Sequence, residues 1–143
     1  MIKLICVGKL KDENLEKLTL EYIKRIKKYH RLEIFEVPRY NDLVKEKQAI
    51  LKLLDKKALV IVLSPQGKEY DSKTFSHFLE KSFNHYGKII FIIGGAEGLD
   101  NELLEQQKIS FSQMTFPHQL FRLIFLEQLY RAFTIMNHEK YHK

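Results

Sequence analysis

The chain has 143 residues, of which 24 are Lys or Arg and 18 are Asp or Glu, so its formal net charge is +6 at pH 7. A hydrophobic content of 45%, with three Pro and six Gly, is enough for a packed core and excludes an intrinsically disordered protein. The length fits one domain over residues 1–143. Residues 1–57 hold fifteen basic and nine acidic side chains, whereas residues 58–143 hold nine of each. The whole positive excess therefore lies in the first two fifths of the chain.

Hydropathy and cysteine content exclude a membrane-spanning protein and a protein with internal disulfides. No apolar run approaches the roughly 20 residues of a membrane-spanning helix. Lys3 interrupts the short apolar run at the N-terminus, which is typical of a strand and not of a signal peptide. Cys6 is the only cysteine, so no internal disulfide can form, and this fits a cytoplasmic protein. Because Cys6 lies within an apolar strand, we expect a core residue and not a nucleophile.

Hydrophobic patterns predict strands and helices in alternation along the chain. On the first helix, a stripe of Leu15, Leu18, Tyr22, Ile26 and Tyr29 is expected to be buried. Alternation of this kind predicts an α/β fold, with a mostly parallel sheet flanked by helices. The expected strands are 2–7, 32–37, 58–63, 89–93 and 109–115; the expected helices are about 12–29, 43–57, 71–83, 101–107 and 117–137; and a turn is expected at 64–67.

The final helix has apolar side chains on nearly every face, from Leu120 to Met136. A helix that is apolar all round must be buried all round, and a small domain does not easily surround one helix. We therefore expect a homodimer in which this helix is both core and interface. The alternative is that the helix threads through its own domain. Glu127 and Arg131 are spaced i to i+4 on this helix, and either a structural pair or a functional role would account for them.

A glycine cluster, Gly94-Gly95-Ala96-Glu97-Gly98, follows the strand at 89–93. Ligands of parallel α/β sheets bind beyond the carboxyl ends of strands, where glycines let the backbone approach closely. The cluster predicts a ligand-binding turn, and the alternative is a tight turn without a ligand. An ordinary dinucleotide site is not expected, because the fingerprint is partial and no acid for a ribose follows the next strand.

The C-terminal residues 138–142 match the His-Glu-x-x-His zinc pattern, but only Lys143 follows the second histidine. A third ligand would have to come from upstream, for example from His118. We expect no metal and favour a polar tail that folds over a polyanion. The histidines His30, His77 and His85 show no metal-ligand spacing and are expected at the surface or its boundary.

Five strings of residues, taken together, resemble one family along essentially the full chain. They are Val7-Gly8-Lys9-Leu10-Lys11, Ile93-Gly94-Gly95-Ala96-Glu97-Gly98-Leu99, Met114-Thr115-Phe116-Pro117-His118-Gln119, Glu127-Gln128-Leu129-Tyr130-Arg131-Ala132 and Tyr141-His142-Lys143. This order and spacing is similar to the ribosomal RNA large subunit methyltransferase H family, which belongs to the SPOUT class.

The resemblance implies an α/β fold with a deep C-terminal trefoil knot, an exception to the usual avoidance of knots. It also implies an obligate homodimer and S-adenosylmethionine as methyl donor. The implied activity is N3 methylation of a pseudouridine in helix 69 of 23S rRNA, on assembled 70S ribosomes, without a membrane or a metal.

Site residues carry over from the family by motif. In this resemblance Arg131, Tyr141 and His142 lie near the RNA base, and Lys143 contacts phosphate. The cofactor is expected to contact Leu63, Gly95, Ser112, Gln113, Met114, Thr115, Phe116 and Pro117. Basic residues of the first half, Lys24, Arg25, Lys27, Lys28 and Arg31, are candidates for rRNA phosphate contacts, the alternative being solvated helix charges.

The chemistry of N3 methylation suggests a role for each residue of the tail. The imide nitrogen must lose its proton before it attacks, and we expect His142 to accept that proton, directly or through water. Arg131 would stabilise the oxyanion that develops on the base, and Tyr141 would stack on it. The chain departs from the family in a short connection between Val37 and Leu43, which affects how the N-terminal half meets RNA, and in Lys143 where some relatives have Arg.

Two other functions remain open from the residues alone. A non-catalytic RNA-binding or ribosome-binding module would need the basic half but not the glycine turn. A metal hydrolase would use the terminal histidines.

Overall fold

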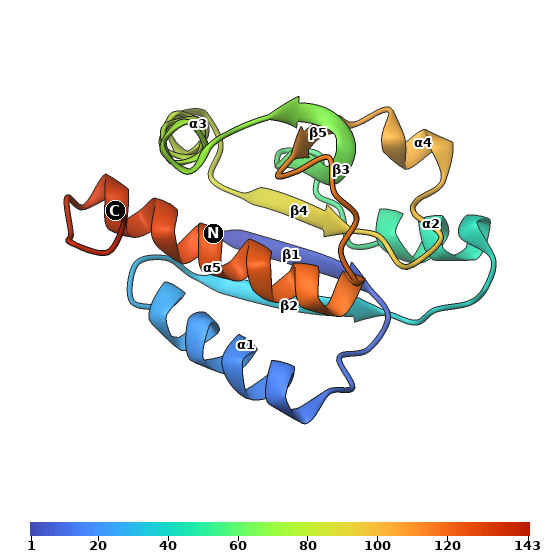
Figure 1. The fold of residues 1–143 in the computed structure, drawn as a ribbon. Helices are drawn as coiled ribbons and strands as arrows, with labels where there is room; N and C mark the ends of the chain where they lie inside the picture. Colours follow the sequence, from blue (N-terminus) through green and yellow to red (C-terminus); the bar gives the residue numbers. More distant parts are fainter.

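Ten helices and strands alternate along the computed structural model, which describes residues 1–143 (Figure 1). All strand pairs in the single five-stranded sheet are parallel, which confirms the predicted α/β class. The elements are β1 (Ile2–Val7), α1 (Glu13–Ile26), β2 (Leu32–Val37), α2 (Leu43–Leu51), β3 (Leu59–Glu69), α3 (Ser72–His85), β4 (Ile89–Ile93), α4 (Asn101–Leu104), β5 (Gln107–Ser110) and α5 (His118–Met136), and the strand order is β2-β1-β4-β3-β5.

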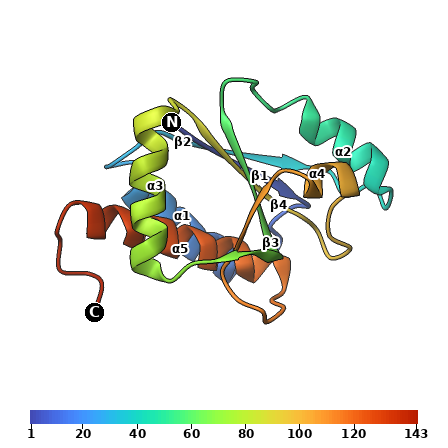
Figure 2. The same ribbon diagram turned by 90° about the horizontal axis from the view of Figure 1, so that it is seen from above.

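Helices cover both faces of the sheet and bury a separate core on each. The helices α1, α3 and α5 lie on one face, and α2 and α4 lie on the other (Figure 2). Successive residues of β1 alternate between the two cores, with Leu4 and Cys6 on the α5 side and Ile5 and Val7 on the α2 side. The five residues of β4 are all buried, as expected for a central strand covered on both faces. None of the helices is long and apolar enough to cross a membrane.

The first helix buries a face slightly different from the predicted one. Asp12 caps α1, because its carboxylate accepts hydrogen bonds from the N–H groups of Asn14 and Leu15 at 2.8 and 3.0 Å. Leu18 was expected inside, yet 51% of its surface is exposed. The neighbouring Thr19 is buried instead. Both residues fit the helical spacing, and the position of α1 against α5 decides between them.

The second helix ends at Leu51, six residues before the predicted end. Turns follow, in which the N–H groups of Leu53 and Leu54 bond carbonyls three residues back. Asp55 then accepts a hydrogen bond from the N–H of Lys57 at 2.9 Å, which stabilises a turn. Lysine has a good helix propensity, so propensity alone would continue the helix through this segment. Tertiary packing therefore ends α2 before the predicted residue 57.

Residues 64–67 do not form the predicted turn but continue β3 to Glu69. Pairing with β5 shifts register between Leu63 and Lys68, so β5 pairs with both halves of this long strand. Gly67 makes this possible, because a Cβ there would lie 2.5 Å from the backbone N of Ile109. The Pro and Gly of this segment therefore mark a bulged strand, and the prediction of a turn was wrong.

The last strand, β5, is shorter than predicted and begins two residues earlier. After Ser110 the chain forms a loop held by local hydrogen bonds. The hydroxyl of Ser110 donates to the carbonyl of Ser112 at 3.1 Å, and the N–H of Met114 donates to the Ser112 hydroxyl at 3.0 Å. These bonds compete with strand pairing and leave residues 111–117 as a loop that leads into α5. The short helix α4 also ends early, at Leu104.

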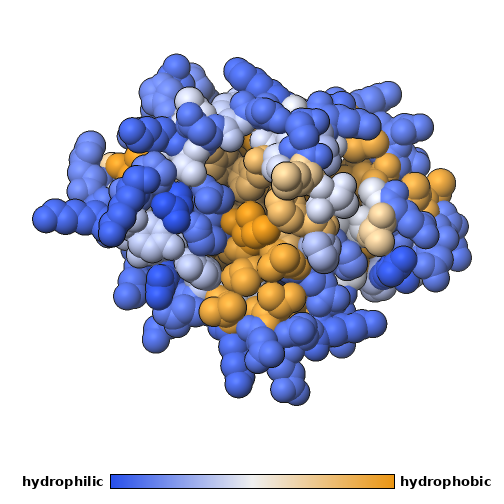
Figure 3. Space-filling model, viewed as in Figure 1, coloured by the Kyte–Doolittle hydropathy of each residue, from blue (hydrophilic) through white to orange (hydrophobic).

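The final helix, α5, begins after Pro117 as predicted and lies between α1 and α3 (Figure 1). Its inner side is buried at Phe125, Leu126 and Leu129. The outer side is not fully covered: Leu120 is exposed, and Leu123 and Ile124 are partly exposed. An apolar patch extends across this face of the molecule (Figure 3). Within one chain, α5 is therefore not buried all round.

Candidate active site

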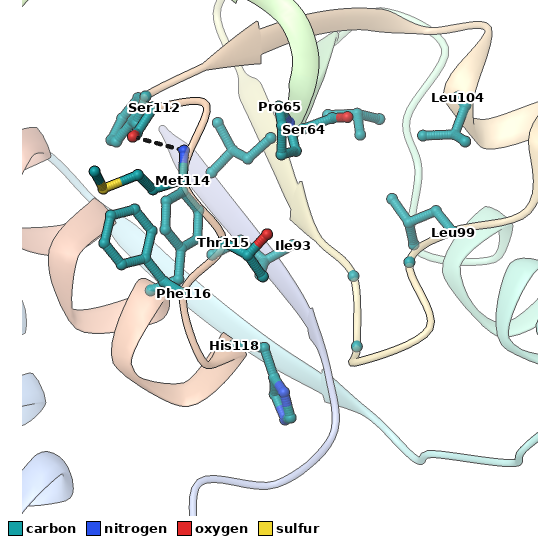
Figure 4. A pocket seen from close by; sticks show the side chains of 17 residues that line it. Ser64, Pro65, Ile93, Leu99, Leu104, Ser112, Met114, Thr115, Phe116 and His118 are labelled. Carbon is teal, nitrogen blue, oxygen red and sulfur yellow. Dashed lines mark hydrogen bonds between the residues drawn. The ribbon is translucent and has the colours of Figure 1, made fainter.

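A pocket opens at the carboxyl end of β4 and beside the middle of β3, and a ligand site beyond the end of a parallel strand was predicted (Figure 4). Its volume is about 190 Å³. Apolar side chains form most of the wall, and a few hydroxyls and one imidazole supply polar groups. The lining residues are Val62, Leu63, Ser64 and Pro65 of β3, Ile93 of β4, Gly94, Gly95, Gly98 and Leu99 of the glycine turn, Leu104 of α4, Phe111, Ser112, Met114, Thr115 and Phe116 of the following loop, and His118 and Phe121 of α5.

Glycines are needed at three positions of the turn for different reasons. At Gly94 a Cβ would lie 2.9 Å from the carbonyl oxygen of Gly98, so the turn would have to open. At Gly95 a Cβ would lie 3.3 Å from Val7 of the core. Gly98 has φ +80°, which L side chains rarely adopt, and its N–H donates to the Gly95 carbonyl at 3.0 Å. The turn therefore places backbone atoms without side chains at the edge of the pocket.

Residues 111–117 form the opposite wall of the pocket. Ser112, Met114, Thr115 and Phe116 all line it, and the labelled side chains surround a common space in Figure 4. Gln113 does not line the pocket, because its amide nitrogen donates to the Pro65 carbonyl at 3.1 Å and to Glu69 Oε1 at 2.8 Å. Gln113 thereby ties the loop to β3.

Of the eight residues proposed for the cofactor, six line this pocket. They are Leu63, Gly95, Ser112, Met114, Thr115 and Phe116, while Gln113 and Pro117 lie in the same loop without lining it. The structure adds Ser64, which the sequence placed in a turn, and Leu104 of α4, which no sequence motif marks as a pocket residue. His118 also lines the pocket, and its pKa is lowered by burial and by the charges of Arg39 and Arg122.

The three tail residues proposed for chemistry also lie together. Arg131 is bound by Glu127 at 2.7 Å, so the i to i+4 pair exists, and this carboxylate raises the pKa of the guanidinium. A second nitrogen, Arg131 Nη1, lies 3.1 Å from His142 Nδ1. The Arg131 guanidinium also lies 4.8 Å from the centre of the Tyr141 ring.

Aromatic residues hold the tail against α1. Tyr29 donates its hydroxyl to both carboxylate oxygens of Glu139, at 2.8 and 2.7 Å. Tyr141 packs edge-on against Tyr130 at 4.8 Å, and its hydroxyl lies 3.4 Å from that of Tyr22. Burial and the contact with Tyr22 raise the pKa of Tyr141 to about 12, so the phenol stays protonated at neutral pH.

The pocket and the tail cluster lie at opposite ends of α5. Figure 1 shows the C-terminus beside the far end of this helix. His118 begins the helix beside the pocket, and Arg131 lies thirteen residues further along it. At about 1.5 Å per residue, this separation is roughly 20 Å. Within one chain, the two groups of residues are therefore too far apart to act on the same atom.

Comparison with known proteins identifies the family. The model described as "Predicted SPOUT methyltransferase" matches residues 1–142. "Ribosomal RNA large subunit methyltransferase H" of Carboxydothermus hydrogenoformans is 42% identical over 99% of both chains. The protein of the same name from Mycoplasmopsis synoviae is 46% identical, again over 99% of both chains. The chain belongs to the ribosomal RNA large subunit methyltransferase H family of SPOUT methyltransferases.

A solved methyltransferase structure has a similar fold. The tRNA (m1G37) methyltransferase from Aquifex aeolicus matches with a TM-score of 0.54, covering 91% of this chain and 69% of that one. Sequence identity is only 15%, so this likeness concerns the fold alone. In this SPOUT chain, the pocket is formed by the glycine turn and by the loop that precedes α5.

Basic residues proposed for RNA contacts lie on and after α1. Lys24 and Lys28 are exposed and form no ion pair. Arg25 pairs with Glu21 at 3.1 Å and lies 5.5 Å from the ring centre of Tyr130, close to the tail cluster. Arg31 pairs with Glu33 beyond the helix, and Lys143 is exposed at the chain end. Part of this surface therefore adjoins the tail, although two of its cations are already partnered.

The structure also answers the remaining questions about single residues. Cys6 is 1% exposed, and burial raises the pKa of its thiol to about 12, which confirms a core residue.

His138 lies beyond the end of α5 with φ 56°, so it shares no helical face with His142. No group of three metal-ligating side chains occurs in the chain, and the metal-hydrolase hypothesis has no geometric support. His77 and His85 are exposed and His30 is half-buried, as expected.

Proposed function

We propose that the protein is an S-adenosylmethionine-dependent rRNA methyltransferase, formed by one SPOUT domain over residues 1–143. The observation that carries this proposal is the pocket between the glycine turn and the 111–117 loop, in a chain whose relatives are named for methylation of large-subunit rRNA. The specific reaction that we propose is N3 methylation of a pseudouridine in helix 69 of 23S rRNA. Its support is the family resemblance of the motifs and the full-length match to these relatives. Action on assembled 70S ribosomes would place the protein in the cytoplasm.

The pocket residues fit a cofactor with an apolar and a polar part. Phe111, Phe116 and Leu99 offer apolar walls for an adenine ring, whereas Ser64 and Thr115 offer hydroxyls for polar groups. The glycine turn leaves space that side chains would fill, so backbone groups can approach the ligand closely. We propose that Leu63, Gly95, Ser112, Met114, Thr115 and Phe116 hold S-adenosylmethionine, while Gln113 and Pro117 shape the loop. When bound, this cofactor supplies an electrophilic methyl group.

In this proposal, the tail residues accept the proton of the target base and stabilise the negative charge that develops on it. A guanidinium only donates hydrogen bonds, so the contact at 3.1 Å makes His142 Nδ1 an acceptor and places the neutral ring's hydrogen on Nε2. His142 can accept the N3 proton at Nδ1 once Arg131 turns from it toward the base. Arg131, anchored by Glu127, is then positioned to stabilise an oxyanion. The raised pKa of Tyr141 argues against a base role and is compatible with stacking.

Single-turnover methylation of His142→Ala tests this assignment. We expect a large loss of rate with an unchanged affinity for S-adenosylmethionine, because His142 is not among the residues that line the cofactor pocket. Retention of the wild-type rate would show that His142 is not the base.

The separation of pocket and tail supports a homodimer with shared active sites. The outer face of α5 presents Leu120, Leu123 and Ile124 near the pocket end of the helix. An antiparallel pairing of two α5 helices would cover these side chains and bring the tail of one protomer to the pocket of its partner. We also expect the trefoil knot of the fold, with α5 following the knotted 111–117 loop.

Complementation between two inactive variants tests this arrangement. Thr115→Trp fills the pocket, and His142→Ala removes the proposed base. If the sites are shared, heterodimers of the two variants contain one intact site, and a mixed preparation recovers roughly a quarter of wild-type activity. If each chain holds a complete site, the mixture stays inactive. Analytical ultracentrifugation that finds only monomers would also contradict the proposal.

The decisive experiment for the proposed function uses unmodified 70S ribosomes. The protein and S-adenosylmethionine are incubated with them, and helix 69 is mapped by mass spectrometry. We expect one added methyl group on a pseudouridine. Methylation at another nucleotide would change the proposed target, and binding to ribosomes without methylation would favour a non-catalytic RNA-binding module.

A further inference from the structure

A second cavity lies directly beside the candidate cofactor pocket. It has a volume of about 510 Å³ and shares His118 with that pocket. Lys9, Lys11 and Arg39 contribute to its wall, together with Glu36. The three cations follow β1 and β2, and Glu36 lies near the end of β2, so the cavity continues the carboxyl edge of the sheet away from the glycine turn.

The Gly8–Lys11 loop is fixed in place by two elements. Glu36 of β2 accepts a hydrogen bond from the N–H of Leu10 at 2.8 Å. Arg122 of α5 binds the same carboxylate at 2.7 Å and donates to the carbonyl of Gly8 at 3.1 Å. Because Arg122 is buried behind this contact, the loop has little freedom to move. The backbone positions of Lys9 and Lys11 are therefore fixed by these contacts.

The first two residues of α5, His118 and Gln119, also contact this loop. Gln119 accepts a hydrogen bond from the N–H of Lys11 at 3.0 Å, and both residues line the cavity. The ring of His118 lies close to Gly8: a Cβ on Gly8 would be 3.7 Å from His118 Nε2. The start of α5, which carries the shared residue His118, thus contacts the loop that carries Lys9 and Lys11.

The charges of this cavity are unbalanced. Lys9, Lys11 and Arg39 are exposed and form no ion pair with the chain. The carboxylate of Glu36 is already neutralised by Arg122. His118 adds no negative charge, and its pKa is lowered by burial and then by the nearby guanidinium groups, which indicates positive potential at the shared wall. Three cations thus line one open cavity whose one carboxylate, that of Glu36, is already paired with Arg122.

We propose that this cavity binds backbone phosphates of the substrate RNA, next to the nucleotide that enters the methylation site. The inference rests on the proposed function and extends it to residues outside the basic surface of α1. RNA suits the site because three cations around an open cavity match the repeated charges of a nucleic-acid backbone. A nucleotide that reaches the cofactor pocket past His118 would place its flanking phosphates within this cavity. The lysines and Arg39 would then fix the register of the RNA without reading its bases.

A triple substitution with a matched control tests the proposal. The test variant is Lys9→Ala, Lys11→Ala and Arg39→Ala. The control is Lys52→Ala, Lys56→Ala and Lys57→Ala, which removes the same charge from exposed residues after α2, at the opposite edge of the sheet. Circular dichroism and thermal melting establish that both variants fold. Binding to unmodified 70S ribosomes is then measured at several salt concentrations, and S-adenosylmethionine affinity is measured by calorimetry.

We expect the test variant to bind ribosomes at least about tenfold more weakly than the control, since a charge-assisted contact is typically worth that much. The slope of log affinity against log salt should fall by about two to three, because each of the three lost phosphate contacts contributes about 0.7–0.9. Affinity for S-adenosylmethionine should equal that of the control. A variant with Lys9→Arg, Lys11→Arg and Arg39→Lys should regain binding.

Each outcome separates this inference from the proposed function. If the wild-type protein methylates ribosomes and both triple variants bind them equally, the inference is wrong and the function stands. If the wild-type protein binds ribosomes through these residues but transfers no methyl group, the assignment of the cavity to RNA phosphates stands and the proposed function fails. Loss of S-adenosylmethionine affinity in the test variant alone would assign the cations to the cofactor and overturn the inference.

Discussion

The buried Arg122 provides a sharp test of how the active-site edge is stabilised. Its side chain is 5% exposed and is bound by Glu36 at 2.7 Å. Glu36→Gln would leave the guanidinium charge without a counter-charge. Breaking a buried ion pair typically costs about 3–5 kcal/mol, but Glu36 is 35% exposed and Gln still accepts hydrogen bonds. We therefore expect the free energy of unfolding to fall by about 2 kcal/mol, or the Tm by ~7 °C.

Urea denaturation, followed by circular dichroism at one protein concentration, measures this change. The matched control is Glu33→Gln on the same strand, whose partner Arg31 is 77% exposed. That surface pair should contribute no more than about 0.5 kcal/mol. Equal effects of the two substitutions would refute the argument, because burial of Arg122 would then have no consequence.

The pH dependence gives an independent check of the same pair. Burial alone would raise the pKa of Glu36, but hydrogen bonds from Arg122 and from the Leu10 N–H outweigh it and lower the pKa. The folded state therefore binds this proton less tightly than the unfolded chain. The stabilisation is present above the unfolded pKa and is lost as pH falls through the folded pKa. The difference between wild type and Glu36→Gln should be largest near neutral pH and shrink below about pH 4.

Three further predictions concern the turn, the tail and the core. Gly98→Ala should lower the free energy of unfolding by about 1 kcal/mol through its φ of +80° alone, because a Cβ there meets no atom within 4 Å; no change in a urea titration would contradict this. Tyr29→Phe should release Glu139 and slow single-turnover methylation at unchanged cofactor affinity; an unchanged rate would mean that the tail holds without this bond. Cys6 should resist alkylation at pH 8 until the protein unfolds, because its pKa is about 12; rapid labelling of the native protein would disprove its burial.

Local signals predicted the fold well where one pattern dominated. The run at Ile89–Ile93 is continuous and apolar, the run at Ile2–Val7 is interrupted only by Lys3, and both form strands with the predicted bounds. Pro117 marked the start of α5 correctly, because its fixed φ and missing N–H suit the first turn of a helix. Predictions failed where two patterns compete, as in the Pro and Gly of residues 64–67, which indicate a turn but belong to a bulged strand.

The sequence by itself determined the α/β class, the central strands, the glycine turn and the burial of Cys6, because these depend on residues that are neighbours along the chain. Tertiary structure alone decided which segments meet: Leu63, the glycine turn and the 111–117 loop enclose one pocket, while the tail lies at the other end of α5. It also decided that Lys9, Lys11 and Arg39 surround a common cavity. Strand order and helix position bring these residues together, and hydrophobic periodicity encodes which face of an element is buried but not which element covers it.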